Sequence, residues 1–216
     1  MLKQRIITAI FLLGLLYAVI YLLPIRYFSW AVGVVVLLGA WEWAALSGLK
    51  NPILRIGYLL LFVFLYFMIN QLPVYDAIKM MSGMAVLWWM WSIVWLLRFQ
   101  RQVQIIQRNT YVFSMIGILV LLPFWYAIVM LNLEQTLNPQ AGQVLLLVII
   151  LVALADTSAY FFGKSFGKHK LASRISPGKS WEGLFGAVFT VTFLVWPLAN
   201  ILNVHAFNHP ELMGLA

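Results

Sequence analysis

The sequence LADTSAYFFGKSFGKHKLASRISPGKSWEG, residues 154–183, joins two apolar segments through the most polar stretch of the chain. It places an acid inside an apolar run, then five basic residues, and then a second acid at the start of the next apolar run. Only 9% of the chain is charged, yet seven charged residues lie in the 27 positions from Asp156 to Glu182. We therefore expect the flanking apolar segments to be helices that hold a polar functional segment between them.

The composition of the 216-residue chain is that of an integral membrane protein. Hydrophobic residues make up 64% of the chain and aromatic residues 16%, and the mean hydropathy is +0.95. A soluble domain of this length could not bury so much apolar surface. The net charge of +8 would indicate a nucleic-acid partner in a soluble protein, but here it predicts membrane orientation instead, so no nucleic acid is expected. The absence of cysteine excludes disulfides and thiolate metal sites.

Seven apolar runs approach the roughly 20 residues that a helix needs to cross the hydrocarbon core. We therefore expect an all-α, polytopic protein that forms a single integral membrane domain over residues 1–216. The first run is longer than the core of a secretion signal and lacks a cleavage site, so it is interpreted as a retained helix. The predicted spans are residues 6–23, 28–46, 56–69, 80–97, 111–131, 144–163 and 183–202.

The basic residues predict a cytoplasmic N-terminus, because loops rich in Lys and Arg stay in the cytoplasm. With that orientation 12 of the 14 basic residues face inward and two face outward. The polar segment would then lie on the cytoplasmic side. The outward pair is Arg26 and Lys79, and the inward set is Lys3, Arg5, Lys50, Arg55, Arg98, Arg101, Arg108, Lys164, Lys168, Lys170, Arg174 and Lys179.

Acids inside predicted spans are candidates for function, because an ionised carboxylate at the bilayer centre costs at least about 2.5 to 3.5 kcal/mol. Asp156 would lie roughly 10 Å inside the helix end at Gly163, on one face with Tyr160. The alternative is an acid neutralised by a basic side chain of a neighbouring helix. We favour function, since Asp156 has polar neighbours in sequence. Glu42, nearer a helix end, fits either a functional role or simple contact with lipid head groups.

The basic segment after Gly163 predicts a phosphate site at the membrane surface. The following helix would begin near Ser176 or Ser180, either of which could cap it, with Pro177 suited to its first turn and Glu182 complementing its dipole. Unpaired N–H groups at such a helix start, together with lysines, bind phosphate. The alternative is a basic loop that only orients the chain. The lysines, the candidate donors and the glycines that would admit a ligand are Lys164, Lys168, His169, Lys170, Arg174, Lys179, Gly163, Gly167, Gly178 and Gly183.

This segment resembles the phosphatidate cytidylyltransferases, also called CDP-diacylglycerol synthases, in the order and spacing of its residues. The region around Glu42 resembles that family more weakly. The family also continues into further helices with an Asp-Arg-x-Asp element, so the resemblance predicts a shortened member that ends at Ala216. The matching residues are Asp156, Ala159, Tyr160, Gly163, Lys164, Phe166, Gly167, Lys168, Lys170, Ile175, Ser176, Pro177, Lys179, Ser180, Glu182 and Gly183.

The resemblance implies transfer of a cytidylyl group from CTP to phosphatidic acid, with magnesium or another divalent cation as cofactor. Asp156 and Glu182 would hold the metal, and Asp156, Lys179 and Glu182 would be catalytic. Membrane lipids are expected partners, and a homodimer is compatible with the resemblance. The remaining residues, predicted to bind substrate, are Tyr160, Lys164, Lys168, Lys170, Arg174, Ser176 and Ser180.

Two other functions are compatible with the same residues. A lipid or polyprenol kinase that uses CTP is similar in its nucleotide-binding part, and it would release CDP instead of pyrophosphate. A non-enzymatic protein that binds or transports anionic lipid would carry polar residues near mid-bilayer in several helices. The predicted spans have few such residues.

Overall fold

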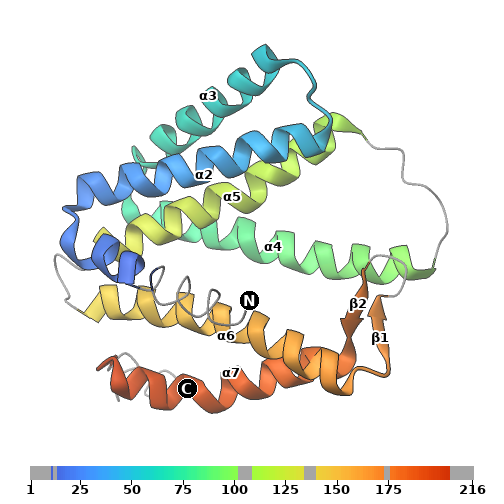
Figure 1. The fold of residues 1–216 in the computed structure, drawn as a ribbon. Coiled ribbons are helices and arrows are strands. Elements are labelled where there is room, and N and C mark those ends of the chain that lie inside the picture. The colour runs from blue at the N-terminus through green and yellow to red at the C-terminus, as the bar shows by residue number, and fades with distance from the viewer. Residues whose placement is uncertain (1–10, 12–13, 102–108, 134–139, 173–175, 205–216) are drawn as a thin grey trace. The chain divides into compact units, whose positions relative to one another are not determined.

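The structure is a computed structural model that describes residues 11, 14–101, 109–133, 140–172 and 176–204. It is almost entirely helical, with one short β-hairpin near the C-terminal end (Figure 1). Residues 14–22 are helical and precede the labelled elements. These elements are α2 (Ile25–Ser47), α3 (Pro52–Ile69), α4 (Val74–Arg101), α5 (Thr110–Leu133), α6 (Gln140–Phe166), β1 (Lys170–Ala172), β2 (Ser176–Ser180) and α7 (Trp181–Ile201).

Six of the seven predicted spans are confirmed as helices, since α2 to α7 are each long and apolar enough to cross a membrane. The predicted span at residues 6–23 lies partly outside the described residues. Several helices are longer than their apolar runs because polar residues extend them. Asn51, for example, accepts a hydrogen bond from the backbone N–H of Ile53 at 2.8 Å, and Pro52 occupies the first turn, so α3 begins four residues before its apolar run.

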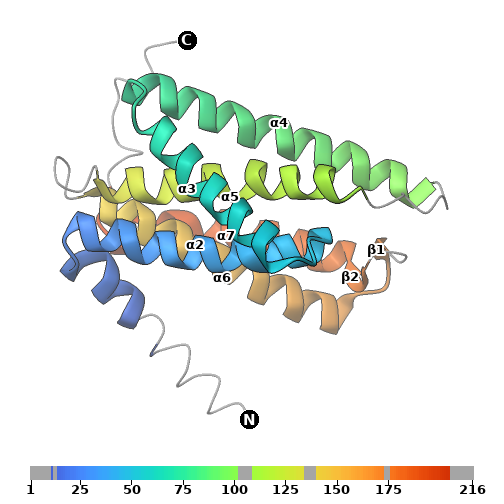
Figure 2. The same cartoon turned by 90° about the horizontal axis from the view of Figure 1, so that it is seen from above.

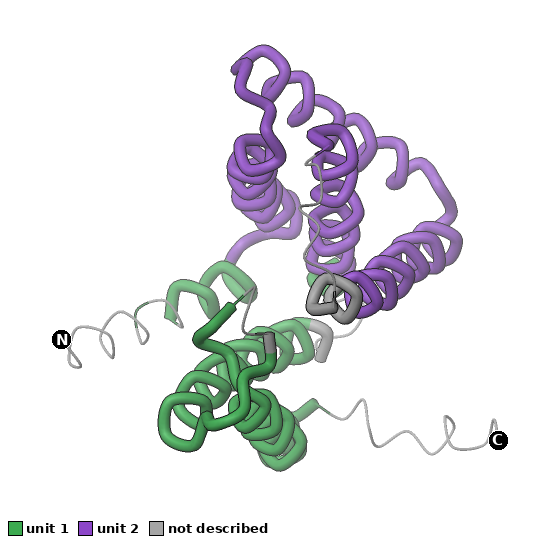
Figure 3. The backbone as a smooth tube through the Cα atoms, turned by 90° about the vertical axis from the view of Figure 1, so that its right-hand side faces the viewer, with its two compact units in different colours: residues 1–22, 131–216 green, residues 23–130 purple. Residues whose placement is uncertain are grey.

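The chain divides into two compact units, which Figure 3 colours separately. Unit 2, Leu23–Met130, contains α2, α3, α4 and most of α5. Its core is apolar and aromatic, with α5 contributing along much of its length. The buried core residues are Ala40, Ala44, Tyr58, Phe62, Ile69, Ala77, Met81, Ile118, Leu122 and Tyr126.

Unit 1 comprises Met1–Leu22 and Leu131–Ala216, and its main feature is the pair α6 and α7. The two helices run side by side, and the β-hairpin lies where α6 ends and α7 begins, as Figures 1 and 2 both show. Toward the other end of the pair, Leu147 packs with Ala199 and Val204 in a small apolar cluster. The chemistry predicted from the sequence therefore falls on the hairpin end of this helix pair.

The hairpin was not predicted, since the sequence analysis treated residues 164–180 as a loop leading into a helix. Strands β1 and β2 pair antiparallel, with Lys170 opposite Ser180 and Ala172 opposite Ser176. Of the two candidate helix starts, Ser180 is the N-cap of α7, and Ser176 lies at the start of β2. The assignment of Pro177 to a first helical turn is wrong, because Pro177 belongs to β2.

Candidate active site at the hairpin end of α6 and α7

Asp156 lies on α6 and its side chain is exposed in the protein. The helix continues to Phe166, three residues past its predicted end, which places Asp156 about 15 Å from the helix end instead of about 10 Å. Within the described residues the one recorded ion pair is between two other side chains, so no neighbouring helix neutralises Asp156 there. The described residues thus give no ion pair for the structural alternative, and the functional role of Asp156 stays a prediction.

The hydroxyls next to Asp156 donate hydrogen bonds to backbone carbonyls of α6. Thr157 Oγ1 donates a hydrogen bond to the carbonyl of Ala153 at 2.7 Å, and Ser158 Oγ donates to that of Leu154 at 2.6 Å. Such bonds to the preceding turn satisfy polar side chains inside an apolar helix. These two residues therefore give less support to a polar ligand site around Asp156 than their sequence positions indicated.

Small residues bring α6 and α7 into close contact at the hairpin end. A Cβ added to Gly183 would lie 2.7 Å from the carbonyl oxygen of Ala159 and 3.2 Å from Cα of Gly163. One added to Gly167 would collide with the carbonyl of Gly163, and it would lie 2.8 Å from Oγ of Ser180. The sequence analysis assigned these three glycines to a ligand. In the structure Gly163 and Gly183 allow the backbones of α6 and α7 to approach, as small residues do between membrane helices. Gly167 follows α6 and lies against the last turn of that helix and the Ser180 hydroxyl.

The first amides of α7 already have acceptors inside the protein. The N–H of Trp181 donates to the carbonyl of His169 at 2.9 Å, and the N–H of Gly183 donates to Oγ of Ser180 at 3.2 Å. Ser180 is itself buried. A phosphate bound at this helix start would have to compete with these bonds. A phosphate site here would therefore depend more on lysine side chains than on free backbone N–H groups.

Glu182 and His169 join the start of α7 to the segment that precedes the hairpin. The backbone N–H of His169 donates to Oε1 and Oε2 of Glu182 at 3.1 and 3.3 Å, and its ring Nδ1 lies 2.7 Å from Oε1. The His169 side chain is 80% exposed and that of Glu182 only 25%. Glu182 thus closes the base of the hairpin, which also places a negative charge at the positive end of the α7 dipole.

Four exposed lysines surround this closed hairpin. Lys164 lies in the last turn of α6, where a positive charge is favoured by the helix dipole, and its Nζ lies 5.7 Å from the ring centroid of Tyr160. Lys168, Lys170 and Lys179 follow on the connecting residue and the two strands, all exposed. Arg174 lies outside the described residues. The arrangement gives a basic cluster on a fixed support, which suits an anionic substrate with several phosphates.

The chain matches the model of the cytidylyltransferase family over residues 3–216. It belongs to this family. It is 35% identical over 215 residues to the phosphatidate cytidylyltransferase of Haemophilus influenzae, covering 94% of this chain and 74% of the relative. It is also 39% identical over 188 residues to that of Pseudomonas aeruginosa, covering 87% and 67%. The corresponding protein of Bacillus subtilis is 30% identical over 199 residues. No solved structure matches the chain significantly.

A metal site in this cytidylyltransferase-family chain would have few protein ligands. Among the described residues, no three His, Cys, Asp or Glu side chains come together. Magnesium commonly uses one or two carboxylates, with water and substrate phosphates completing its shell. The exposed Asp156 fits such a site as a single carboxylate ligand. Glu182 fits it less well, because both of its oxygens already accept hydrogen bonds from His169.

His169 is the residue in this family member whose role the sequence analysis missed. It was interpreted as one more cation or donor of the loop, whereas it bonds to both Trp181 and Glu182. The two partners lie 12 and 13 positions away, and no helical or strand periodicity connects them. Only a prediction of the β-hairpin would have indicated that His169 lies next to the start of α7.

Proposed function

We propose that this chain transfers a cytidylyl group from CTP to phosphatidic acid, giving CDP-diacylglycerol and pyrophosphate. The observation that carries the proposal is the family match over residues 3–216. The basic cluster at the hairpin supports it, because both substrates are anionic and their phosphates must be held together. The names of the relatives from Haemophilus influenzae and Pseudomonas aeruginosa support the same reaction.

In the proposed reaction an oxygen of the lipid phosphate attacks the α-phosphorus of CTP. A new P–O bond forms, the bond from the α-phosphorus to the bridging oxygen of the β-phosphate breaks, and pyrophosphate leaves with that oxygen. Four or more negative charges share the site during this step. Lys164, Lys168, Lys170 and Lys179 would bind these phosphates and hold the attacking and leaving oxygens in line.

Asp156 would hold the divalent cation, with Glu182 as the weaker candidate for a second ligand. Bound magnesium would neutralise charge on the phosphates as pyrophosphate departs. The role proposed for Glu182 that has direct support is positional, since it fixes His169 and the hairpin against α7. Ser180 has a similar role as the buried N-cap of α7, while Ser176 at the start of β2 remains a candidate hydrogen-bond donor to substrate.

We infer that the protein is a multi-pass protein of the bacterial inner membrane with its basic cluster in the cytoplasm. The distribution of basic residues among the loops supports this orientation, and CTP is available on that side. The acyl chains of phosphatidic acid would lie beside α6 and α7. Phe161, Phe185, Phe189 and Phe193 are exposed along these helices and offer apolar contact to such chains.

The test is an assay of CDP-lipid formation from labelled CTP by the full-length membrane protein. Asp156→Asn and Lys179→Gln are each expected to lower kcat/KM by about 100-fold or more, as loss of groups that act on the transferred phosphoryl charge does. Lys79→Gln is the matched control, because Lys79 is an exposed lysine of α4 in unit 2. Unchanged turnover in both site variants would contradict the proposal.

The same assay separates the proposed reaction from its two alternatives. Release of pyrophosphate identifies a cytidylyltransferase, whereas release of CDP identifies a kinase. Binding of phosphatidic acid with neither product would indicate a protein that binds or transports lipid.

A further inference from the structure

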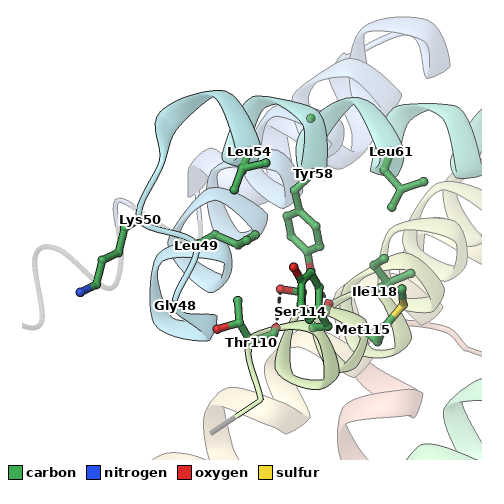
Figure 4. Close-up of a pocket in the computed structure, with 12 residues that line it drawn as sticks. Gly48, Leu49, Lys50, Leu54, Tyr58, Leu61, Thr110, Ser114, Met115 and Ile118 are labelled. Atoms are coloured by element: carbon green, nitrogen blue, oxygen red, sulfur yellow. Dashed lines mark hydrogen bonds between the residues drawn. The ribbon is translucent and has the colours of Figure 1, made fainter.

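A groove of about 460 Å³ lies in unit 2, between the start of α3 and the start of α5, and none of the hairpin residues lines it (Figure 4). Its volume falls within the range of about 300 to 1,000 Å³ that small-molecule sites occupy. On α3 it is lined by Leu54, Gly57, Tyr58 and Leu61, which share one helical face. On α5 it is lined by Thr110, Tyr111, Ser114, Met115 and Ile118, and the turn between α2 and α3 adds Gly48, Leu49 and Lys50.

Polar atoms in the groove wall are engaged inside the protein. The Tyr58 hydroxyl donates to the carbonyl of Ser114 at 2.7 Å. Ser114 Oγ donates to the carbonyl of Thr110 at 2.8 Å and lies 2.9 Å from the hydroxyl of Ser47. These bonds leave an apolar surface for an occupant, since the side chains that remain are mainly Leu, Ile and Met. A hydrocarbon chain fits such a wall, and a polar ligand buried there would find few donors.

The turn that closes one end of the groove has a defined conformation. Gly48 has φ +104°, and a Cβ at this position would lie 2.9 Å from Oγ1 of Thr110. Arg55 Nε donates to the carbonyl of Leu49 at 2.6 Å, and its guanidinium lies 5.4 Å from the ring centroid of Trp41. The groove and its rim are therefore built by contacts within unit 2 alone.

Lys50 is the charged residue among those lining the groove in the described part of the chain, and no acid lines it there. Its side chain is exposed and extends outward from the turn at the groove end, as Figure 4 shows. The nearest acid along α2 is Glu42, eight residues earlier. A positive charge at the end of an apolar groove matches a molecule with a hydrocarbon part and an anionic head.

We propose that this groove is a binding site for one anionic phospholipid, separate from the phosphatidic acid that reacts. An acyl chain lies along the faces of α3 and α5, and the phosphate group lies at the rim beside Lys50. The span from Leu54 to Leu61 covers about 10 Å of helix, which is enough to hold part of one chain. A zwitterionic lipid would place its own positive charge near Lys50, so the site prefers lipids with net negative charge.

The test uses the full chain in nanodiscs or mixed micelles that contain either phosphatidylglycerol or phosphatidylcholine, with retained lipid counted by native mass spectrometry. Gly57→Leu fills the groove, and no described heavy atom lies within 4 Å of a Cβ added at Gly57. Lys50→Gln removes the charge and keeps the groove. Gly83→Leu and Lys79→Gln are the matched controls. Gly83 is an exposed helical glycine with the same open surroundings, and neither residue lines the groove.

The wild-type protein is expected to retain one phosphatidylglycerol that Gly57→Leu loses and Gly83→Leu keeps. Leu is a better helix former than Gly, so Gly57→Leu should fold, which its elution profile and circular dichroism would confirm. Lys50→Gln should lower the preference for phosphatidylglycerol over phosphatidylcholine about fivefold, and Lys79→Gln should leave it unchanged. If Gly57→Leu does not fold, the head-group preference of Lys50→Gln decides the proposal by itself.

Two results would overturn this assignment. Equal lipid retention and equal head-group preference in all variants would exclude an anionic site in the groove. Loss of the lipid together with a parallel rise in KM for phosphatidic acid would make the groove part of the substrate path. Lipid retention and head-group preference are measured without turnover, so these two results are independent of whether the proposed reaction is correct, and only the comparison of KM depends on it.

Discussion

The helix contacts of unit 2 involve large side chains, some of them seated on glycine, whereas at the hairpin end of unit 1 backbone meets backbone. In unit 2 large side chains fill the space between helices, as in the contact of Trp43 Nε1 with the carbonyl of Phe113 at 2.7 Å and the stacking of Tyr66 on Trp125. In unit 1 the hairpin ends of α6 and α7 meet through glycine, with Gly183 against Ala159. A Cβ added to Gly117 in unit 2 would collide with the side chains of Trp43 and Tyr58, whereas at the candidate site the close contacts are between backbone atoms.

This difference has a consequence for where polar groups can lie. Between bulky side chains a few hydroxyl and indole groups are buried: the Trp43 indole donates to α5, whereas the Trp125 indole N–H has no partner among the described residues. Where glycines remove the side chains, α7 begins directly against α6, and the hairpin is held at a defined position. The lysines of the hairpin therefore lie next to a close contact between α6 and α7, which would favour a fixed geometry for substrate phosphates.

The largest expected effect comes from Gly183→Ala. The added Cβ would lie 2.7 Å from a backbone oxygen, so the two helices must separate. We expect a loss of about 1 to 3 kcal/mol in the free energy of unfolding and loss of most CDP-lipid formation. Thermal unfolding in detergent and the labelled-CTP assay measure these effects. Gly39→Ala is the control, since no described atom lies within 4 Å of its added Cβ. A Gly183→Ala protein as stable and active as wild type would disprove the close-contact argument.

A smaller effect is expected from Tyr58→Phe in unit 2. The change removes the 2.7 Å hydrogen bond to the Ser114 carbonyl and keeps the ring that packs on Phe62. We expect a loss of about 0.5 to 1.5 kcal/mol in the free energy of unfolding, with activity per folded molecule unchanged. Tyr75→Phe is the control, because Tyr75 is 75% exposed. Lower activity per folded molecule for Tyr58→Phe would show that the site depends on the packing of unit 2.

The sequence was sufficient to predict the membrane helices, and the comparison of the units explains why. A run of about 20 apolar residues has one stable arrangement in a bilayer, so its length alone identifies α2 to α7. Helix ends were less well predicted, because polar residues such as Asn51 and Lys164 extend a helix beyond its apolar run. The largest of these errors is in unit 2, where α4 begins at Val74, six residues before its predicted span, and ends at Arg101, four residues after it.

At the candidate site the structure shows connections between residues that the sequence did not predict. A sequence does not show whether a glycine leaves room for a ligand or for another helix. The role of Gly183 in the contact with α6 could therefore not be predicted. Strand β1 has only three residues and no clear alternation, which left the hairpin without a signal. The pairing of His169 with Glu182 depends on that hairpin, so it was missed for the same reason.

The pair His169 and Glu182 should affect activity more than stability. His169→Ala removes the ring contact but keeps the backbone N–H bonds to the carboxylate, whereas Glu182→Ala removes both. We expect kcat/KM for CTP to fall by up to about fivefold in His169→Ala, and further in Glu182→Ala. The double variant should match Glu182→Ala, because the histidine ring has lost its partner.

Steady-state kinetics of the three variants measure this coupling, with Asp76→Asn as an acid control in the first turn of α4. A role limited to positioning the lysines would raise KM for CTP and leave kcat nearly unchanged. Multiplicative losses in the double variant would show that the two residues act independently, against the observed 2.7 Å contact.

The smallest effect on stability is expected at Gly178, the remaining glycine of the segment. No described atom lies within 4 Å of a Cβ added there, and its backbone φ is not in the positive range. Gly178→Ala should therefore change the free energy of unfolding by no more than about 0.5 kcal/mol. No contact within the described residues requires glycine at this position. For Gly178 the prediction that a glycine lets a ligand approach the backbone therefore still stands.

We accordingly expect Gly178→Ala to raise KM for CTP without altering thermal unfolding. Gly183→Ala, in contrast, is expected to lower the free energy of unfolding. Titration of CTP against the purified variant, with unfolding measured on the same sample, tests both parts. An unchanged KM would mean that substrate phosphates do not approach the β2 backbone at Gly178. In that case the lysine side chains alone hold the nucleotide, and the glycines of the segment serve helix contact and hairpin geometry.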